Sequence, residues 1–240
     1  MIPSNKSLYK KICLVVACFS LLQLCEGQQK DTLKIVAFGN STTAPRNTIQ
    51  KVYAARLQDT LTALGINAVV INSGQGGSHT GSIKDNNFHK VAHAMDRFDT
   101  AVSRYHANWV IVSFGMNDSW QDNGMQGPSR ISTDQYRDNL SYFIDQVRKN
   151  NGRPILMTTN PTGKKYEQWR YDMLEKYMNI TRSVAKNKKV PLVDVWDLFY
   201  KNVKNQPGGV DALLLDGMHP NDAGHKIMSD ALVKIILSKK

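Results

Sequence analysis

Cysteine is scarce in this sequence, and its positions are informative. The 240 residues contain three cysteines, Cys13, Cys18 and Cys25, and all lie near the N-terminus. The rest of the chain therefore has no disulfide to stabilise it, no thiolate for a metal site and no cysteine nucleophile. A chain of this length can bury a sizeable core without such help, and it has room for one ordinary domain.

Long hydrophobic runs are also scarce. The one clear run, residues 12–24, follows three lysines and precedes the small residues Cys25 and Gly27. This order is typical of a secretory signal, so we expect residues 1–27 to be removed and residues 28–240 to form a secreted or periplasmic domain. The run is short for a bilayer span, which makes an uncleaved anchor the weaker alternative. Lipidation at Cys25 is a further alternative, although Leu24 is unfavourable before a lipidated cysteine.

Acidic residues are outnumbered, with 31 lysines and arginines against 20 aspartates and glutamates and a net charge of +11. A basic surface can attract acidic polysaccharide, anionic lipid or nucleic acid. Most lysines are scattered, however, apart from short pairs such as Lys164-Lys165. Together with the export signal, this scatter predicts a generally solvated basic surface and no nucleic-acid partner.

Short apolar runs alternate with amphipathic patterns throughout the chain. The runs predict buried strands at residues 33–38, 68–71, 109–114, 155–158 and 191–195. The amphipathic patterns predict helices at residues 48–64, 87–105, 132–151, 166–186 and 222–237. Strict alternation of this kind predicts right-handed crossovers, and hence an α/β domain with a mostly parallel sheet covered on both faces.

A turn near the C-terminus carries Asp216 three residues before His219. A carboxylate that accepts from one imidazole nitrogen fixes the tautomer, and it leaves the other nitrogen free to take a proton from a hydroxyl nucleophile. An isolated Asp-x-x-His more often caps a turn, so this reading depends on a nucleophile elsewhere.

Three polar segments follow the first three predicted strands, and they carry Ser41, Gly77 and Asn117. In parallel sheets ligands bind at the carboxyl ends of the strands, where these segments would converge. Ser41 could present a hydroxyl, Gly77 a free backbone amide and Asn117 an amide side chain to a developing oxyanion. On its own, each segment is also explained by a plain turn, and for Gly39-Asn40-Ser41 the plain turn is the better explanation. No serine lies in a G-x-S-x-G pentapeptide, which argues against the nucleophile elbow of α/β-hydrolases.

Taken together, these residues resemble the SGNH, or GDSL-type, hydrolases. The block 39–44 (Gly-Asn-Ser-Thr-Thr-Ala) is similar to their nucleophile block, and Asn72-x-Gly74-x-x-Gly77 to their glycine block. Gly115-x-Asn117-Asp118 resembles their asparagine block, and Asp216-x-x-His219-Pro their closing block.

The resemblance implies a flavodoxin-like three-layer α/β/α fold with a five-stranded sheet. It also implies serine ester hydrolysis without cofactor, with Ser41 as nucleophile, His219 as base and Asp216 as its orienting carboxylate. The implied oxyanion donors are the amides of Ser41 and Gly77 and the side chain of Asn117. Asn40 stands where the family usually has aspartate, and we expect activity to survive because asparagine keeps an acceptor for the local turn.

Other side chains give weaker indications. His79 and Trp120 are candidate substrate contacts, although a solvated histidine and a packed aromatic are equally consistent with their positions. His89 and His93 have the i, i+4 spacing of metal ligands on a helix, but with no third ligand evident we expect no metal.

The sequence predicts an exported esterase that removes small acyl groups, chiefly acetyl, from small-molecule or polysaccharide carbohydrate esters. The context Ser41-Thr-Thr-Ala resembles the carbohydrate acetylesterases of the superfamily, such as the rhamnogalacturonan type, more than its lipases. Two alternatives stay open: a lysophospholipase, thioesterase or arylesterase on the same scaffold, and an inactive glycan-binding relative.

Overall fold

The computed structural model describes residues 32–238. The predicted signal segment 1–27, with its three cysteines, lies outside the described residues. Five strands form one sheet in the order β2-β1-β3-β4-β5, and all neighbouring pairs are parallel. The strands are β1 (Leu33–Gly39), β2 (Ala68–Gly74), β3 (Trp109–Ser113), β4 (Arg153–Met157) and β5 (Leu192–Val193). This is the flavodoxin-like order, as predicted from the family resemblance.

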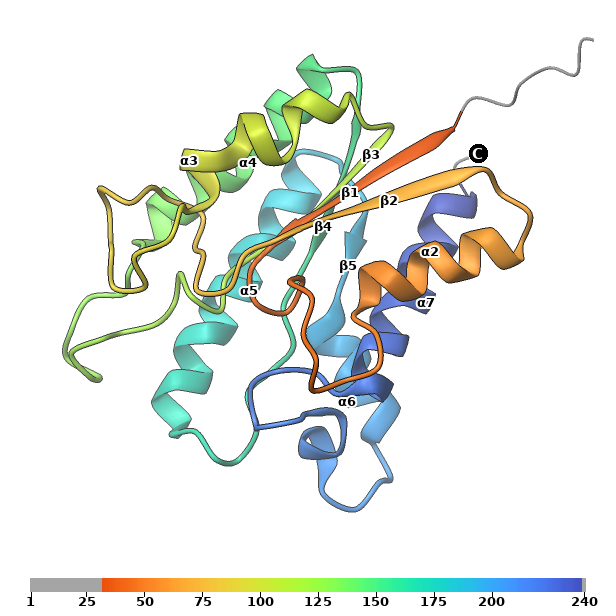
Figure 1. Cartoon of the computed structure of the whole chain (residues 1–240). Helices are drawn as coiled ribbons and strands as arrows, with labels where there is room; N and C mark the ends of the chain where they lie inside the picture. Colours follow the sequence, from red (N-terminus) through yellow and green to blue (C-terminus); the bar gives the residue numbers. More distant parts are fainter. Residues whose placement is uncertain (1–31, 239–240) are drawn as a thin grey trace, which may run out of the picture. The chain divides into compact units, whose positions relative to one another are not determined.

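Helices cover both faces of this sheet (Figure 1). They are α2 (Tyr53–Ala63), α3 (Ala94–Ala101), α4 (Thr133–Lys149), α5 (Gln168–Asn187), α6 (Val195–Val203) and α7 (Asp222–Ser238), with short 3₁₀ segments η2 (Ser103–Tyr105) and η3 (Gly209–Leu213). Helices α3, α4 and α5 lie on one side, and α2, α6 and α7 on the other. The predicted three-layer α/β/α architecture is therefore confirmed.

Strand alternation divides the core into two clusters. In β1, Val36 and Phe38 point to the face covered by α3, α4 and α5, whereas Ile35 and Ala37 point to the other face. All four are fully buried, because a central parallel strand is covered on both sides. The fold thus rests on apolar burial, and residues 32–238, which contain no cysteine, have no disulfide within them.

Three helices differ from the prediction. The helix expected at residues 48–64 begins only at Tyr53, the first residue of α2. The helix expected at residues 87–105 begins only at Ala94, because Lys90 has a left-handed φ of 49° and the amide of Ala94 donates to His79 O instead of to a helical turn. Helix α6 was not predicted. Asp194 caps it by accepting from the amide of Asp197, and this cap also shortens β5 to two residues.

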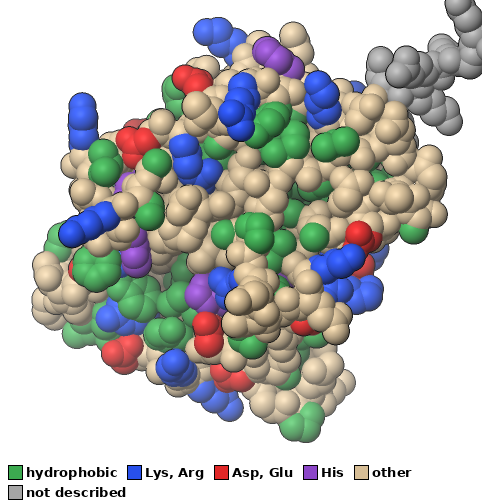
Figure 2. Space-filling view, in the orientation of Figure 1, with side chains coloured by type: hydrophobic (Ala, Val, Ile, Leu, Met, Phe, Trp, Pro, Cys, Tyr) green, Lys and Arg blue, Asp and Glu red, His purple; other side chains and the backbone are tan. Residues whose placement is uncertain are grey.

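The basic surface is dispersed. On the face shown in Figure 2, lysine and arginine side chains lie singly among acidic and neutral ones and form no continuous patch. Several pair locally with carboxylates, for example Lys51 with Asp59 and Lys188 with Asp145. None of the helices between residues 32 and 238 combines the length and apolar character that a bilayer span requires.

Candidate active site

The predicted site residues follow successive strands at one edge of the sheet. Ser41 lies two residues past the end of β1, Gly77 three past β2, and Asn117 four past β3. Gly39, the last residue of β1, is in register with Gly74 of β2 and Ser113 of β3, so the three following segments start side by side.

Ser41, His219 and Asp216 form a continuous hydrogen-bonded chain. His219 Nε2 lies 3.0 Å from Ser41 Oγ, and His219 Nδ1 lies 2.8 Å from Asp216 Oδ2. A carboxylate can only accept, so Nδ1 carries the proton and Nε2 presents its lone pair to the serine hydroxyl. This arrangement can draw a proton from a hydroxyl as that hydroxyl attacks a carbonyl carbon.

Asp216 also organises the backbone of its own turn. Its Oδ1 accepts from the amides of Met218 (3.0 Å) and His219 (2.8 Å). Burial acts to raise the pKa of Asp216, but hydrogen bonds from the side chain and backbone of His219 outweigh it and lower the pKa to about 2. The carboxylate therefore stays ionised at any pH well above this value.

Contacts from distant segments hold the turn in place. The amide of Leu215 donates to His219 O (2.7 Å), which closes the turn on itself. Asn160 Nδ2 donates to Met218 O (2.8 Å), and the amide of Gly163 donates to Gly217 O (2.7 Å). Asn160 is fully buried in the loop after β4. Sequence reasoning missed its role, because only the fold brings the two loops together.

The turn that carries Ser41 is held by Asn40. The amides of Thr43 and Ala44 donate to Asn40 O, and the amide of Thr42 donates to Asn40 Oδ1 (3.0 Å). Asparagine thus supplies the acceptor that the turn requires, as expected. Arg46, which the sequence analysis did not select, donates from Nη2 to Ser41 O (3.0 Å) and so holds the serine from the other side.

Asn117 contacts the segment that carries Gly77 through a hydrogen bond to Ser78, the next residue. Asn117 Nδ2 donates to Ser78 O at 3.1 Å. Gly77 has a φ of 75°, and a Cβ there would lie 2.6 Å from the ring of His89, so both backbone conformation and space require glycine. The structure thus joins the predicted glycine and asparagine segments in one group and Ser41, Asp216 and His219 in another.

Asp118 links the segment that follows β2 to the segment that follows β3. It is fully buried; its Oδ1 accepts from the amide (2.7 Å) and hydroxyl (2.5 Å) of Thr80, and its Oδ2 accepts from the amide of Gly115 (2.9 Å). Burial raises the pKa of Asp118 to about 6, although these hydrogen bonds favour the carboxylate. The sequence placed Asp118 in the asparagine block but did not reveal this bridging role.

His79 is not placed to contact substrate. Its side chain is fully buried, its ring stacks on that of His93 with centroids 3.5 Å apart, and its Nε2 lies 3.0 Å from Asn86 O. Because His79 is buried, the expected contact with substrate is wrong, and so is the alternative of a solvated loop histidine. His89 and His93 do not share a helix, and among residues 32–238 no group of His, Cys, Asp or Glu has the geometry of a metal site.

Trp120 is half-buried beside the asparagine segment. The guanidinium of Arg170 lies 4.0 Å from the centroid of the Trp120 ring and 4.1 Å from that of Trp169, and Tyr166 meets Trp120 edge-on at 6.0 Å. Trp120 therefore packs in an aromatic and cationic cluster. Whether it also contacts a ligand stays a prediction.

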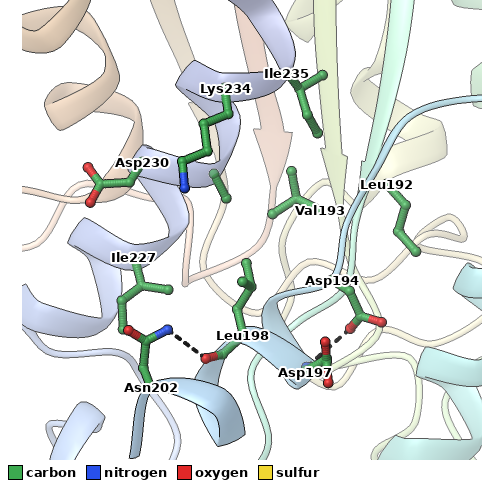
Figure 3. Close-up of a pocket in the computed structure, with 11 residues that line it drawn as sticks. Leu192, Val193, Asp194, Asp197, Leu198, Asn202, Ile227, Asp230, Lys234 and Ile235 are labelled. Carbon is green, nitrogen blue, oxygen red and sulfur yellow. Dashed lines mark hydrogen bonds between the residues drawn. The ribbon is translucent and has the colours of Figure 1, made fainter. Parts of the chain in front are cut away.

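One surface pocket lies apart from Ser41 and His219. It has a volume of about 420 Å³ and lies along β5 between α6 and α7 (Figure 3). Val193, Leu198, Ile227 and Ile235 give it apolar walls, and neither Ser41 nor His219 lines it. The pocket is thus separate from the hydrogen-bonded chain of Ser41, His219 and Asp216.

The sequence and the fold both resemble those of known proteins. The sequence matches the GDSL-like Lipase/Acylhydrolase family over residues 37–227. It is 32% identical over 196 residues to the uncharacterized lipoprotein YqeF of Bacillus subtilis (strain 168), covering 73% of this chain and 74% of that protein.

Among solved structures, the acetylxylan esterase Axe2 from Geobacillus stearothermophilus has a TM-score of 0.65 and 22% identity, covering 84% of this chain and 92% of Axe2. LAE5, an alpha/beta hydrolase enzyme from the metagenome of Lake Arreo, Spain, has a TM-score of 0.65 and 21% identity, covering 84% and 93%. These two structures share the fold, and the family match covers most of the chain. The chain therefore belongs to the GDSL-like lipase/acylhydrolase family.

Proposed function

We propose that this protein is an exported serine esterase that releases small acyl groups, chiefly acetyl, from carbohydrate esters. The observation that carries the proposal is the chain from Ser41 Oγ through the His219 imidazole to the Asp216 carboxylate, with contacts of 3.0 and 2.8 Å. Family membership supports ester hydrolysis. Catalytic mutants of Axe2 replace a serine, an aspartate and a histidine three residues after it, the same residue types and spacing.

In this mechanism His219 Nε2 accepts the proton of Ser41 as Oγ bonds to the ester carbonyl carbon. The imidazolium that forms is stabilised by Asp216, which stays ionised because its pKa is about 2. The imidazolium then protonates the leaving alcohol, the carbon–oxygen bond of the ester breaks, and an acyl-enzyme remains. Water repeats the sequence on the acyl-enzyme, releasing the acid and restoring the Ser41 hydroxyl.

The oxyanion would be held by the amides of Ser41 and Gly77 and by Asn117 Nδ2. Asn117 supports this role because its amide group has two hydrogens, and only one is used by Ser78 O. The positive φ of Gly77 supports an amide turned away from regular backbone pairing. Donors fixed before the reaction lower the barrier more than donors that must reorient.

Two observations support the acetyl and carbohydrate parts of the proposal. Axe2, which shares the fold, is described as an acetylxylan esterase. Trp120 and Tyr166 beside the site offer half-buried aromatic surface of the kind that packs on sugar rings. We therefore propose Trp120, but not His79, as a substrate contact.

One observation favours the alternative of a lysophospholipase, thioesterase or arylesterase. Phe88 and Met125 are 63% and 57% exposed on the loops near Asn117, and they could receive a longer acyl chain. Hydrolysis rates of nitrophenyl esters from acetate to palmitate separate the two functions. We expect the rate to fall as the acyl chain lengthens, and a preference for long chains would replace the acetylesterase proposal with the lipid one.

Export is supported by the relative YqeF, which is described as a lipoprotein. We propose cleavage after Gly27 and a secreted or periplasmic product. Mass spectrometry of the protein purified from its native host distinguishes a free terminus at Gln28 from a diacylated Cys25.

The direct test of function is acetate release from a panel of acetylated polysaccharides, with Ser41→Ala as the matched control. We expect the wild-type protein to release acetate and the variant to release none above the uncatalysed rate. Binding of the polysaccharide without acetate release by either protein would instead identify an inactive glycan-binding relative.

A further inference from the structure

The side-chain amide of Asn117 must face one particular way to serve an oxyanion. Its Nδ2 donates, whereas its Oδ1 would repel a negatively charged oxygen, and the two ends have almost the same shape. The side chain is only partly buried. Something must therefore fix which end points to the reacting carbonyl.

Two contacts of opposite chemistry fix this orientation. Ser78 O can only accept, and it lies 3.1 Å from Asn117 Nδ2. The guanidinium of Arg130 can only donate, and its Nη1 lies 3.3 Å from Asn117 Oδ1. Exchanging the two ends of the amide would place a carbonyl against a carbonyl and an N–H against an N–H. The second hydrogen on Nδ2 is left for a ligand.

Arg130 is itself held firmly. Its Nε and Nη2 donate to the carboxylate of Asp122 at 2.7 to 3.2 Å, and its guanidinium lies 4.8 Å from the centroid of the Phe88 ring. The Arg130 side chain is 3% exposed, and its backbone amide donates to Trp120 O (2.9 Å). Burial acts to raise the pKa of Asp122, but the hydrogen bonds and charge of Arg130 lower it below its usual range.

We propose that Arg130 is a positioning residue for the oxyanion hole, holding Asn117 Oδ1 so that Asn117 Nδ2 faces the oxygen on which charge develops. Asp122 and Phe88 hold Arg130 in turn. The loop 121–130 therefore affects the reaction only through the side-chain amide of Asn117. This inference rests on the proposed esterase function. It adds to that function a residue that no sequence motif indicates, since Arg130 lies thirteen positions after Asn117.

A purely structural role for Arg130 makes a different prediction. If Arg130 only anchored the loop 121–130, its removal would lower the melting temperature and disturb substrate binding, whether or not Asn117 is present. If it positions Asn117, its removal lowers kcat with little change in KM, because the lost interaction is made in the transition state. The effect must also vanish when Asn117 is already absent.

The test is a double-mutant cycle with Arg130→Met and Asn117→Ala, assayed on nitrophenyl acetate. Ser78 O still favours the working orientation, so Arg130→Met should lower kcat about tenfold, less than the roughly hundredfold loss expected when an oxyanion donor is deleted. In the Asn117→Ala background the same change should alter kcat less than about twofold. Arg130→Lys keeps one donor and should recover part of the activity.

Arg182 provides a matched control. Its Nε and Nη2 donate to the two carboxylate oxygens of Asp194 at 2.7 and 3.0 Å, as Arg130 donates to Asp122. Asp194 lies between β5 and α6. Arg182→Met should lower the melting temperature and leave kcat unchanged. If Arg130→Met does not fold, Arg130→Lys and Asp122→Asn complete the cycle, and each should lower kcat only when Asn117 is present.

The outcomes are distinguishable from failure of the proposed function itself. If wild-type protein does not hydrolyse nitrophenyl acetate, or if Ser41→Ala hydrolyses it equally well, the esterase proposal fails. If wild-type protein is active but loss of Arg130 lowers kcat by the same factor with and without Asn117, the positioning role is overturned while the esterase stands. An unchanged kcat in Arg130→Met also overturns it.

Discussion

Replacing Asp216 with asparagine tests how the site fixes its base. Asp216 Oδ1 accepts from two backbone amides, and Oδ2 accepts from His219 Nδ1. Asparagine has one carbonyl oxygen for these three donors. If that oxygen faces the two amides, the NH₂ group faces Nδ1. If it faces Nδ1, the NH₂ group opposes both amides.

The first arrangement should prevail, because it keeps two neutral hydrogen bonds of about 1 kcal/mol each, whereas the second keeps one and sets the NH₂ group against two N–H donors. An NH₂ group facing Nδ1 requires Nδ1 to accept, which moves the imidazole proton to Nε2. His219 then presents N–H instead of a lone pair to Ser41. The fold survives, and the base is lost.

We expect Asp216→Asn to lower kcat about 10³- to 10⁴-fold, equivalent to roughly 4–5.5 kcal/mol, because this substitution in a serine triad costs about 10⁴-fold. Nitrophenyl acetate hydrolysis measures the rate, and circular dichroism checks that the variant is folded. Asp216→Ala is the control: without an opposing NH₂ group His219 can keep either tautomer, so it should retain more activity than Asp216→Asn. A variant Asp216→Asn with more than about a tenth of wild-type kcat would refute the tautomer argument.

Three further predictions concern the neighbouring groups. Asn117→Ala should lower kcat about a hundredfold, or about 3 kcal/mol, with KM little changed, as steady-state kinetics on nitrophenyl acetate will show. Gly77→Ala should lower both the melting temperature and kcat, because its φ of 75° is unfavourable for alanine and its Cβ would lie 2.6 Å from the His89 ring and 2.8 Å from His89 Cβ; adding His89→Gly, which removes both groups, should recover only the part due to contact. The pKa values of His93 and His225 are lowered by burial to about 4 and about 3, so only the unfolded chain gains these protons below pH 6.5. Stability should therefore fall as the pH drops from about 6.5 towards 4, and thermal unfolding across that range should show no such loss if the two histidines are readily charged in the fold.

Much of the fold could be predicted because it is encoded locally. The run at residues 33–38 is apolar on both faces, which is what a central parallel strand requires, and Val36 and Phe38 are indeed buried on one face and Ile35 and Ala37 on the other. Ser132 lies at the start of the helix predicted at residues 132–151, and its side chain accepts from the amide of Gln135. Caps, glycine turns and apolar periodicity all act within a few residues, so the sequence displays them directly.

One error arose where a distant contact decides the structure, and another at the junction between two elements. The segment 87–93 has a helical pattern, yet it forms a loop because the His93 ring packs on His79 and Lys90 takes a left-handed φ. Helix α6 was overlooked because it follows β5 without a loop, although Asp194 and Asp197 show the spacing of a cap.

In the candidate site, too, the residues in local motifs could be predicted and the residues that depend on distant contacts could not. Ser41, Gly77, Asn117, Asp216 and His219 lie in short blocks that the sequence displays. The residues that hold them in place do not lie in such blocks. Arg130 reaches Asn117 from thirteen residues away, and Asn160 reaches Met218 from 58 residues away. Such contacts depend on which loops the parallel sheet brings to one edge, and no local pattern reports them.

The most direct test of the central claim is labelling by a fluorophosphonate, which reacts with a serine hydroxyl only when a neighbouring base activates it. Folded wild-type protein should gain one phosphonyl group on Ser41, located by peptide mass spectrometry, and His219→Ala should react far more slowly. Absence of labelling in folded wild-type protein, or labelling at the same rate in His219→Ala, would contradict the activation of Ser41 by His219.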